Sequence, residues 1–181
     1  MNNVYVYSKN KNRNEYGLPF QSLKRHKPFI NTTFHIRSLY EGKKTLLDKK
    51  NGFNSMGHDN VSPSYIKEVI DDEDTNLILI LTDNTKRENI RGFVLLHIND
   101  FQMELSIICV NKRPNVRTRS NINYGNGSQL INIITFLGKG LVYGIKTYAL
   151  DNIVPYYYKF GWRFIVNDRA TERSHLINVY Q

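Results

Sequence analysis

Three apolar segments, joined by short polar links, constrain the fold more than any other part of the chain. They are LILILT (77–82), IRGFVLLHI (90–98) and MELSIICV (103–110), and each has the length and composition of a largely buried strand. The polar links between them are too short for the crossover that parallel strands need. We therefore expect three consecutive antiparallel strands.

A helix and another strand follow these three segments. From Ser128 to Leu137 the apolar residues repeat at helical spacing, and two glycines follow as stop signals. The strand IKTYAL (145–150) comes next. This passage from strand through helix to strand is a crossover, so strands 103–110 and 145–150 should be parallel neighbours. We predict an α/β (α+β) fold with a mixed, mostly antiparallel sheet, a central parallel pair and flanking helices.

The remaining segments complete the expected order of elements. TFHIRSL favours a strand, EGKKTLLDKK and SYIKEVID favour helices, NIVPYYYKF favours a short helix, and WRFIV and SHLINVY favour two last strands. The first 31 residues predict an irregular lead-in with a short strand at Val4–Tyr7. We therefore expect a basic N-terminal arm, residues 1–31, and one domain, residues 32–181.

The positive charge is concentrated near the N-terminus. Residues 1–50 hold 11 Lys or Arg against three acids, a net +8, whereas residues 51–181 hold 14 against 13 and are nearly neutral. A basic arm can contact a polyanion, here through residues 9–27, and the partner would be nucleic acid or an acidic protein. The alternative is a solvated segment whose Lys and Asn reflect an AT-rich genome, viral or other.

Several features narrow the class of protein. The N-terminus does not resemble a secretory signal, and no apolar run approaches the ~20 residues of a membrane span. The single cysteine, Cys109, excludes an internal disulfide and is expected to be a buried thiol rather than a nucleophile. No two of the five histidines have metal-ligand spacing, so no metal is expected. We expect a soluble protein of the reducing cytoplasm, monomer or homodimer.

The stretch INYGNGSQLIN places Gly125 and Gly127 just ahead of the expected helix. Glycine adopts backbone angles closed to other residues and lets a ligand approach the chain closely. The free amides at a helix start bind anions, most often phosphate. The pair alone is a common turn, so its meaning depends on the neighbouring segments.

Three segments in order resemble the GNAT superfamily of acyl-CoA-dependent N-acyltransferases. They are the strand MELSIICV, the glycine turn and helix GNGSQLINII, and the tail YALDNIVPYYYKFGWRF, and the resemblance covers roughly residues 33–180. It implies a transferase that uses acetyl-CoA as cosubstrate and no metal. The expected reaction is direct acetyl transfer to a primary amine in a ternary complex.

The resemblance also implies a coenzyme A site. In the family, the strand before the glycine turn splays from its parallel neighbour and pairs with the pantetheine amides. Amides at the helix start bind the pyrophosphate, and an Asn often touches pantetheine. Carried over to this sequence, these positions are Ile108, Val110, Asn123, Gly125, Asn126, Gly127, Ser128 and Asn152.

Two residues match catalytic positions of the family. Glu104 matches the carboxylate that serves as base in the protein-lysine branch, and Tyr157, four residues before a glycine, matches the usual acid. Tyr156 and Tyr158 flank it and leave the register open by one. The structural alternatives are a surface carboxylate and an aromatic cluster packed on the sheet, and His97 is an alternative base.

The sequence departs from the family at one position of the expected phosphate loop. Ile122 stands where the family has a basic or amide residue, and the loop from Val110 to Gly125 is longer than usual, although Arg117 and Arg119 could supply the charge. Two functions remain: an N-acetyltransferase, or a GNAT-fold module that acts on nucleic acid or an acidic partner through its basic arm. Protein lysine, N-terminal amines, polyamines, amino sugars and drugs all remain possible acceptors.

Overall fold

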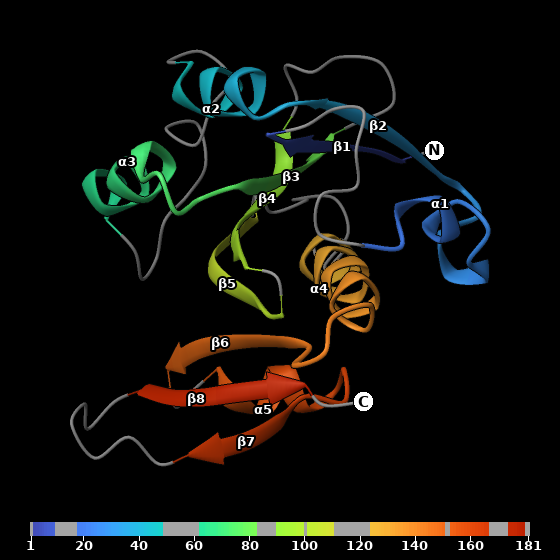
Figure 1. The fold of residues 1–181 in the computed structure, drawn as a ribbon, viewed down its shortest axis with the longest axis vertical. Coiled ribbons are helices and arrows are strands. Elements are labelled where there is room, and N and C mark those ends of the chain that lie inside the picture. Colours follow the sequence, from blue (N-terminus) through green and yellow to red (C-terminus); the bar gives the residue numbers. More distant parts are fainter. Residues whose placement is uncertain are drawn as a thin grey trace, which may run out of the picture.

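The described residues form an eight-stranded mixed sheet with helices on both faces (Figure 1). The strand order across the sheet is β2-β1-β3-β4-β5-β6-β8-β7. The computed structural model describes residues 2–9, 18–48, 62–82, 90–99, 101–110, 124–150, 153–166 and 174–179.

From residue 32 onward the helices and strands follow the order expected from the sequence, whereas residues 20–29, expected to be irregular, hold two short helical segments. The strands are β1 (Asn2–Ser8), β2 (Thr32–Ser38), β3 (Leu77–Thr82), β4 (Ile90–Ile98), β5 (Met103–Val110), β6 (Ile145–Leu150), β7 (Arg163–Val166) and β8 (Ser174–Val179). The helices are α1 (Phe20–Leu23), the 3-10 turn η1 (Lys27–Phe29), α2 (Leu39–Leu47), α3 (Pro63–Asp71), α4 (Tyr124–Gly138) and α5 (Val154–Tyr158). Among these described helices, none has both the length and the hydropathy to cross a bilayer.

The expected antiparallel strands and crossover are confirmed. β4 pairs antiparallel with β3 on one side and with β5 on the other. After β5 the chain passes through α4 and returns as β6, which pairs in parallel with β5. The connection puts α4 across one face of the sheet, where it packs on β4 and β5 (Figure 1). The mixed sheet with a central parallel pair follows from this arrangement.

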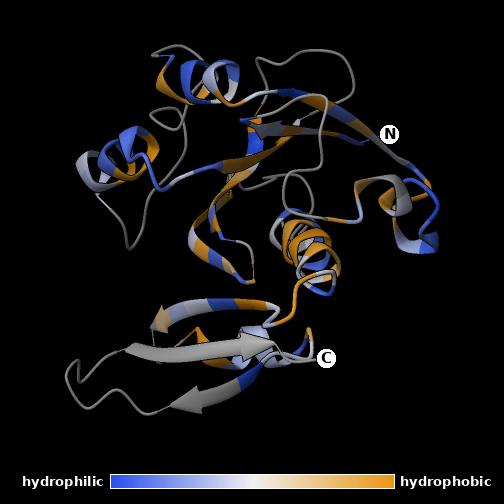
Figure 2. Cartoon of the chain, viewed as in Figure 1, coloured by the Kyte–Doolittle hydropathy of each residue, from blue (hydrophilic) through white to orange (hydrophobic). Residues whose placement is uncertain are grey.

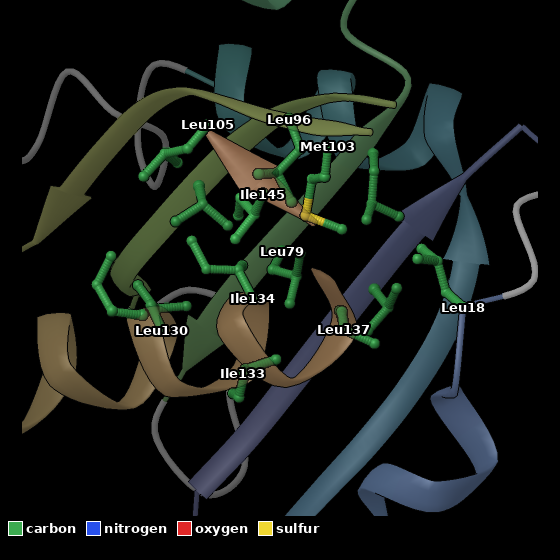
Figure 3. Packing of buried hydrophobic residues seen from close by; sticks show 14 of the residues in the cluster. Leu18, Leu79, Leu96, Met103, Leu105, Leu130, Ile133, Ile134, Leu137 and Ile145 are labelled. Carbon is green, nitrogen blue, oxygen red and sulfur yellow. The ribbon is translucent and has the colours of Figure 1, made fainter. Parts of the chain in front are cut away.

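Each face of the sheet has its own hydrophobic core. On one face, the apolar side of α4 packs on residues such as Leu79, Leu96 and Met103 (Figure 3). On the other face, α2 and α3 cover a second core. Figure 2 shows that α4 is mostly apolar, whereas α2 and α3 carry apolar and polar stripes. The second core contains Tyr7, Leu39, Leu46, Ile66, Ile70, Ile78, Ile80, Ile90, Phe93, Leu95 and Ile107.

The N-terminal segment differs from its expected role as a separate arm. β1 lies inside the sheet, parallel to β2 and antiparallel to β3. Leu18, Leu23 and Phe29 are buried in the core under α4. The described part of residues 1–31 therefore belongs to the domain, because alternate side chains of β1 enter the two cores.

The packing of α2 on β1 generates a stability prediction. A Cβ at Gly42 would lie 2.6 Å from the Tyr7 ring atom Cγ, and Tyr7 is buried. Gly42→Ala gains up to about 1 kcal/mol of helix propensity. The overpacking costs about 1–3 kcal/mol, so we expect net destabilisation in urea unfolding. Lys44→Ala, on the exposed side of α2, should change stability little. A more stable Gly42→Ala protein would show that α2 does not rest on Tyr7.

Candidate active site

The parallel pair of β5 and β6 is short and then diverges. Among the described residues, the two strands pair only between Met103–Leu105 and Ile145–Thr147, although both continue beyond these residues. Figure 1 shows β5 and β6 separating. Past the last pair, every second residue of β5 presents backbone groups toward β6 without a partner strand there. Ile108 and Val110 lie in this part of β5, which we call the splayed segment (106–110).

A bulge lies where the splay begins. Leu105 pairs with Leu96, and Ile107 pairs with Leu95, so Ser106 is an extra residue on β5. A bulge bends its strand and increases the local twist. It also changes which face the side chains meet: Leu105 packs in the core under α4, and Ile107 packs in the core under α2 and α3. The bend thus explains why β5 leaves β6 at this point.

Thr147 closes the last rung of the parallel pair. Its Oγ1 donates a 2.8 Å hydrogen bond to the carbonyl of Leu105, and its side chain is only 3% exposed. A buried carbonyl without a hydrogen-bond partner lowers stability. The Thr147 hydroxyl supplies a partner for the Leu105 carbonyl at the place where the pairing of β5 with β6 ends. Sequence analysis missed this role. The available signal was a polar residue inside the apolar strand IKTYAL.

The two glycines lie inside α4, not in a turn ahead of it. α4 begins at Tyr124, and neither Gly125 nor Gly127 has a positive φ. The expectation of a glycine turn is therefore wrong. In helical geometry the amides of Tyr124, Gly125 and Asn126 have no carbonyl partner within α4. Among the described residues, none would lie within 4 Å of a Cβ at Gly125, so none of them blocks a ligand from these amides.

Gly127 has a different reason to lack a side chain. A Cβ there would lie 3.0 Å from the Tyr156 hydroxyl oxygen and 3.6 Å from Val110 Cγ1. Tyr156 also hydrogen-bonds the Ser128 side chain. The Ser128 amide, expected to bind phosphate, has the Tyr124 carbonyl as its partner in helical geometry. Tyr156 thus joins α5 to the start of α4 at Gly127, a position that also lies close to Val110 at the end of β5.

The three consecutive tyrosines occupy three environments. Tyr156 is half-buried beside Gly127, and burial raises the pKa of its phenol while the hydrogen bond with Ser128 lowers it in part. Tyr157 is only 5% exposed, and its ring lies 5.0 Å from the ring of Trp162. Burial, and then the neighbouring Tyr156, raise the pKa of Tyr157 well above its ordinary value. Tyr158 is 45% exposed.

Glu104 lies on the face of the sheet opposite α4. Its neighbours Met103 and Leu105 are buried under α4, so the alternation of β5 points Glu104 the other way. Its Oε2 lies 3.0 Å from Lys146 Nζ on β6. On β4 its cross-strand neighbour is His97, whose Nδ1 lies 2.7 Å from the Asp74 carbonyl and must carry the proton in that bond. Glu104 is thus an ion-paired carboxylate.

The other sequence predictions have mixed outcomes. Cys109 is half-buried, and desolvation raises the pKa of its thiol to about 12, so it is not a nucleophile at neutral pH. Asn123 and Asn152 lie outside the described residues, as do Ile122, Arg117 and Arg119. Within the described ranges, no cluster of three or more His, Cys, Asp or Glu could hold a metal.

A mixed sheet with a splayed central parallel pair, followed by a helix start, defines the class of the GNAT N-acetyltransferase fold. No family model matches the sequence, and no curated protein matches it. The chain is similar to the catalytic domain of the Tetrahymena GCN5 histone acetyltransferase in complex with coenzyme A. The TM-score is 0.52 at 16% identity, over 99% of this chain and 93% of that one.

Two further solved structures are similar to this chain. Ard1 from Thermoplasma volcanium has a TM-score of 0.48 at 11% identity, over 75% of this chain and 90% of that one. Arabidopsis thaliana Naa50, in complex with a bisubstrate analogue, has a TM-score of 0.45 at 12% identity, over 76% and 93%. The resemblance to the GNAT superfamily is confirmed at the level of the fold.

The contact between Gly127 and Tyr156 predicts coupled stability effects. Gly127→Ala should destabilise the protein, whereas Gly125→Ala, where no described residue lies within reach of a Cβ, should be neutral or stabilising through helix propensity. Tyr156→Phe removes the crowded oxygen, so Gly127→Ala should cost less in that background. A double-mutant cycle by thermal unfolding should give a coupling of at least about 0.5 kcal/mol. Additive effects would show that the two residues do not touch.

Proposed function

We propose that the protein transfers an acetyl group from acetyl-CoA to a primary amine, directly in a ternary complex. The observation that carries this proposal is the divergence of β5 from β6 beside the N-terminus of α4. The backbone of Ile108 and Val110 would pair with the pantetheine amides. The first-turn amides of α4 would bind the pyrophosphate, and the space that the described residues leave at Gly125 supports its approach.

The reaction needs a proton acceptor and a proton donor near the start of the splay. Glu104 would accept a proton from the acceptor amine through water. Tyr157 holds the family's position for the acid. An ordinary tyrosine pKa of ~10 exceeds the ~8.5 of a thiol, and burial raises the pKa of Tyr157 further. Tyr157 would therefore assist by a hydrogen bond that strengthens as thiolate charge develops.

Tyr156 would bind the cofactor rather than act as the acid. Its hydroxyl lies against Gly127 and near Val110 at the far end of the splayed segment. Four residues of extended strand separate Val110 from Ser106, which corresponds to about 13 Å. The thioester would lie near Ser106, so the Tyr156 hydroxyl would contact the pantetheine or pyrophosphate instead.

The proposed acceptor is a primary amine. The Tetrahymena protein that shares this fold is a histone acetyltransferase, which supports an amine acceptor. Protein lysine, N-terminal amines, polyamines and amino sugars remain the candidates. The alternative function is a binding module that contacts a polyanion through its basic N-terminal residues. Lys24, Arg25 and Lys27 are exposed and available for such a contact.

Acetyl-CoA binding is the direct test between these two functions. Acetyl-CoA at 100 times its Kd should stabilise the protein by about 2.7 kcal/mol, measured as a rise in Tm. Gly125→Val should remove the shift, because its side chain would cover the first-turn amides. Asn132→Ala, on the exposed side of α4, should keep it. No shift at millimolar acetyl-CoA would contradict the enzyme and favour the binding module.

The three tyrosines should separate binding from turnover. Tyr157→Phe should lower turnover about 10²–10⁴-fold with little change in acetyl-CoA affinity. Tyr156→Phe should weaken acetyl-CoA binding while turnover at saturation stays close to the parent. Tyr158→Phe, at an exposed position, is the matched control. Turnover is measured by thiol release and affinity by calorimetry. The assignment is reversed if Tyr156→Phe loses turnover at saturation and Tyr157→Phe does not.

A further inference from the structure

The carboxylate proposed as base already has a cation beside it. Glu104 and Lys146 are opposite each other in the parallel pair of β5 and β6, one residue before the strands diverge. Lys146 Nζ lies 3.0 Å from Glu104 Oε2, and the side chains are 27% and 30% exposed. The ion pair thus lies at the edge of the proposed acetyl-transfer site and remains within reach of an incoming acceptor.

An acceptor lysine would compete with Lys146 for the carboxylate of Glu104. Both carry the same ε-ammonium group, but Lys146 is tethered to the next strand. A tethered group has an effective concentration in the millimolar range or above, so it outcompetes a dilute acceptor even when the pair itself is weak. Its positive charge also disfavours a second ammonium beside Glu104. The site therefore gives little help in deprotonating a strongly basic amine.

The other polar groups described near Glu104 do not discriminate between amines. His97 lies across from Glu104 on β4, and its Nδ1–H donates to the carbonyl of Asp74. This bond holds the exposed acidic turn after α3, residues 72–74, near the same face. Such a turn attracts any positively charged acceptor. Selectivity must then come from the chemistry of the amine itself.

We infer that the preferred acceptor is an α-amino group, such as the N-terminus of a peptide, rather than a lysine side chain. This inference rests on the proposed acetyl transfer. An α-amine has an ordinary pKa of about 7.7–8.0, against about 10.4 for lysine. At pH 7.5 roughly a third of the α-amine is neutral, compared with about 0.1% of the lysine. An α-amine therefore reacts with little need for a free base.

The transfer step balances without a strong base. The neutral amine nitrogen attacks the thioester carbonyl carbon, a C–N bond forms, and the C–S bond breaks with its electron pair on sulfur. The nitrogen then loses one proton, which water carries to the thiolate, either directly or by way of Glu104. The products are the N-acetylated amine and the free thiol of CoA.

Two matched peptides test the inference. One has a free α-amine and no lysine, and the other has the same sequence with a blocked N-terminus and one internal lysine. We expect kcat/KM at pH 7.5 to be at least tenfold higher for the first. The ratio of the two kcat/KM values should stay below the ratio of the neutral amine fractions, because a neutral lysine amine is a better nucleophile than a neutral α-amine. Equal rates, or a faster lysine peptide, would overturn the inference.

Variants at Lys146 test the cause of the preference. Lys146→Met frees Glu104 and should raise kcat/KM for the lysine peptide several-fold, with a smaller change for the α-amine peptide. Lys146→Arg keeps the ion pair and should keep the preference. An unchanged lysine rate in a folded Lys146→Met protein would overturn the role of Lys146. The wild-type comparison holds even if Lys146→Met does not fold.

The test also separates this inference from the proposed function. Acetyl-CoA binding with transfer to neither peptide would overturn the α-amine acceptor and leave the cofactor site standing. Absence of acetyl-CoA binding by Tm shift would overturn the proposed acetyl transfer itself, and the inference with it.

Discussion

The candidate site depends on where the parallel pairing of β5 and β6 stops. Three residue pairs hold the strands together, and the Thr147 hydroxyl satisfies the Leu105 carbonyl at the last of them. The bulge at Ser106 then bends β5 away. Without this stop the ladder would continue and its own hydrogen bonds would occupy the backbone of the splayed segment. Because the Thr147 hydroxyl satisfies the Leu105 carbonyl and the bulge bends β5 away from β6, the backbone groups of the splayed segment stay available to a ligand.

The rest of the fold holds α4 close to the splayed segment. A Cβ at Gly92 on β4 would lie 3.0 Å from the Cys109 carbonyl oxygen and from Leu130 of α4, so the missing side chain permits close helix–sheet packing. On the other side of α4, the Gln129 side chain accepts a hydrogen bond from Asn2 and donates one to Thr32. The N-terminal strand therefore helps to fix the helix whose first turn would bind the cofactor. Its basic neighbours could contact a polyanion, but β1 itself is structural.

The sequence predicted the elements well because their patterns are local. Periodicity and link length were enough for the meander, the crossover and the parallel pair. The start of α4 was misplaced, because glycine and asparagine have low helix propensity and their role here depends on contacts with Tyr156. The sequence did not reveal that β1 lies inside the sheet, because a strand that is covered on both faces does not alternate between apolar and polar residues. Its basic surroundings favoured an arm instead.

Residue roles at the site were less predictable than the fold. The pairing of Glu104 with Lys146 depends on the register of two strands separated by a helix, which no spacing in the sequence encodes. The different burial of Tyr156, Tyr157 and Tyr158 depends on how a helix of five residues docks on the sheet. These features follow from tertiary packing, and the sequence supplies only the candidate residue types.

The central claim is that the splayed segment and the first turn of α4 together bind coenzyme A. The most direct measurement is residue-resolved amide hydrogen exchange by NMR, with and without CoA. We predict slower exchange in residues 106–110 of β5 and at Tyr124, Gly125 and Asn126, while the amides of β1 and β2 stay unchanged. Unchanged exchange at both places under saturating CoA, or protection confined to the basic N-terminal residues, would contradict this account.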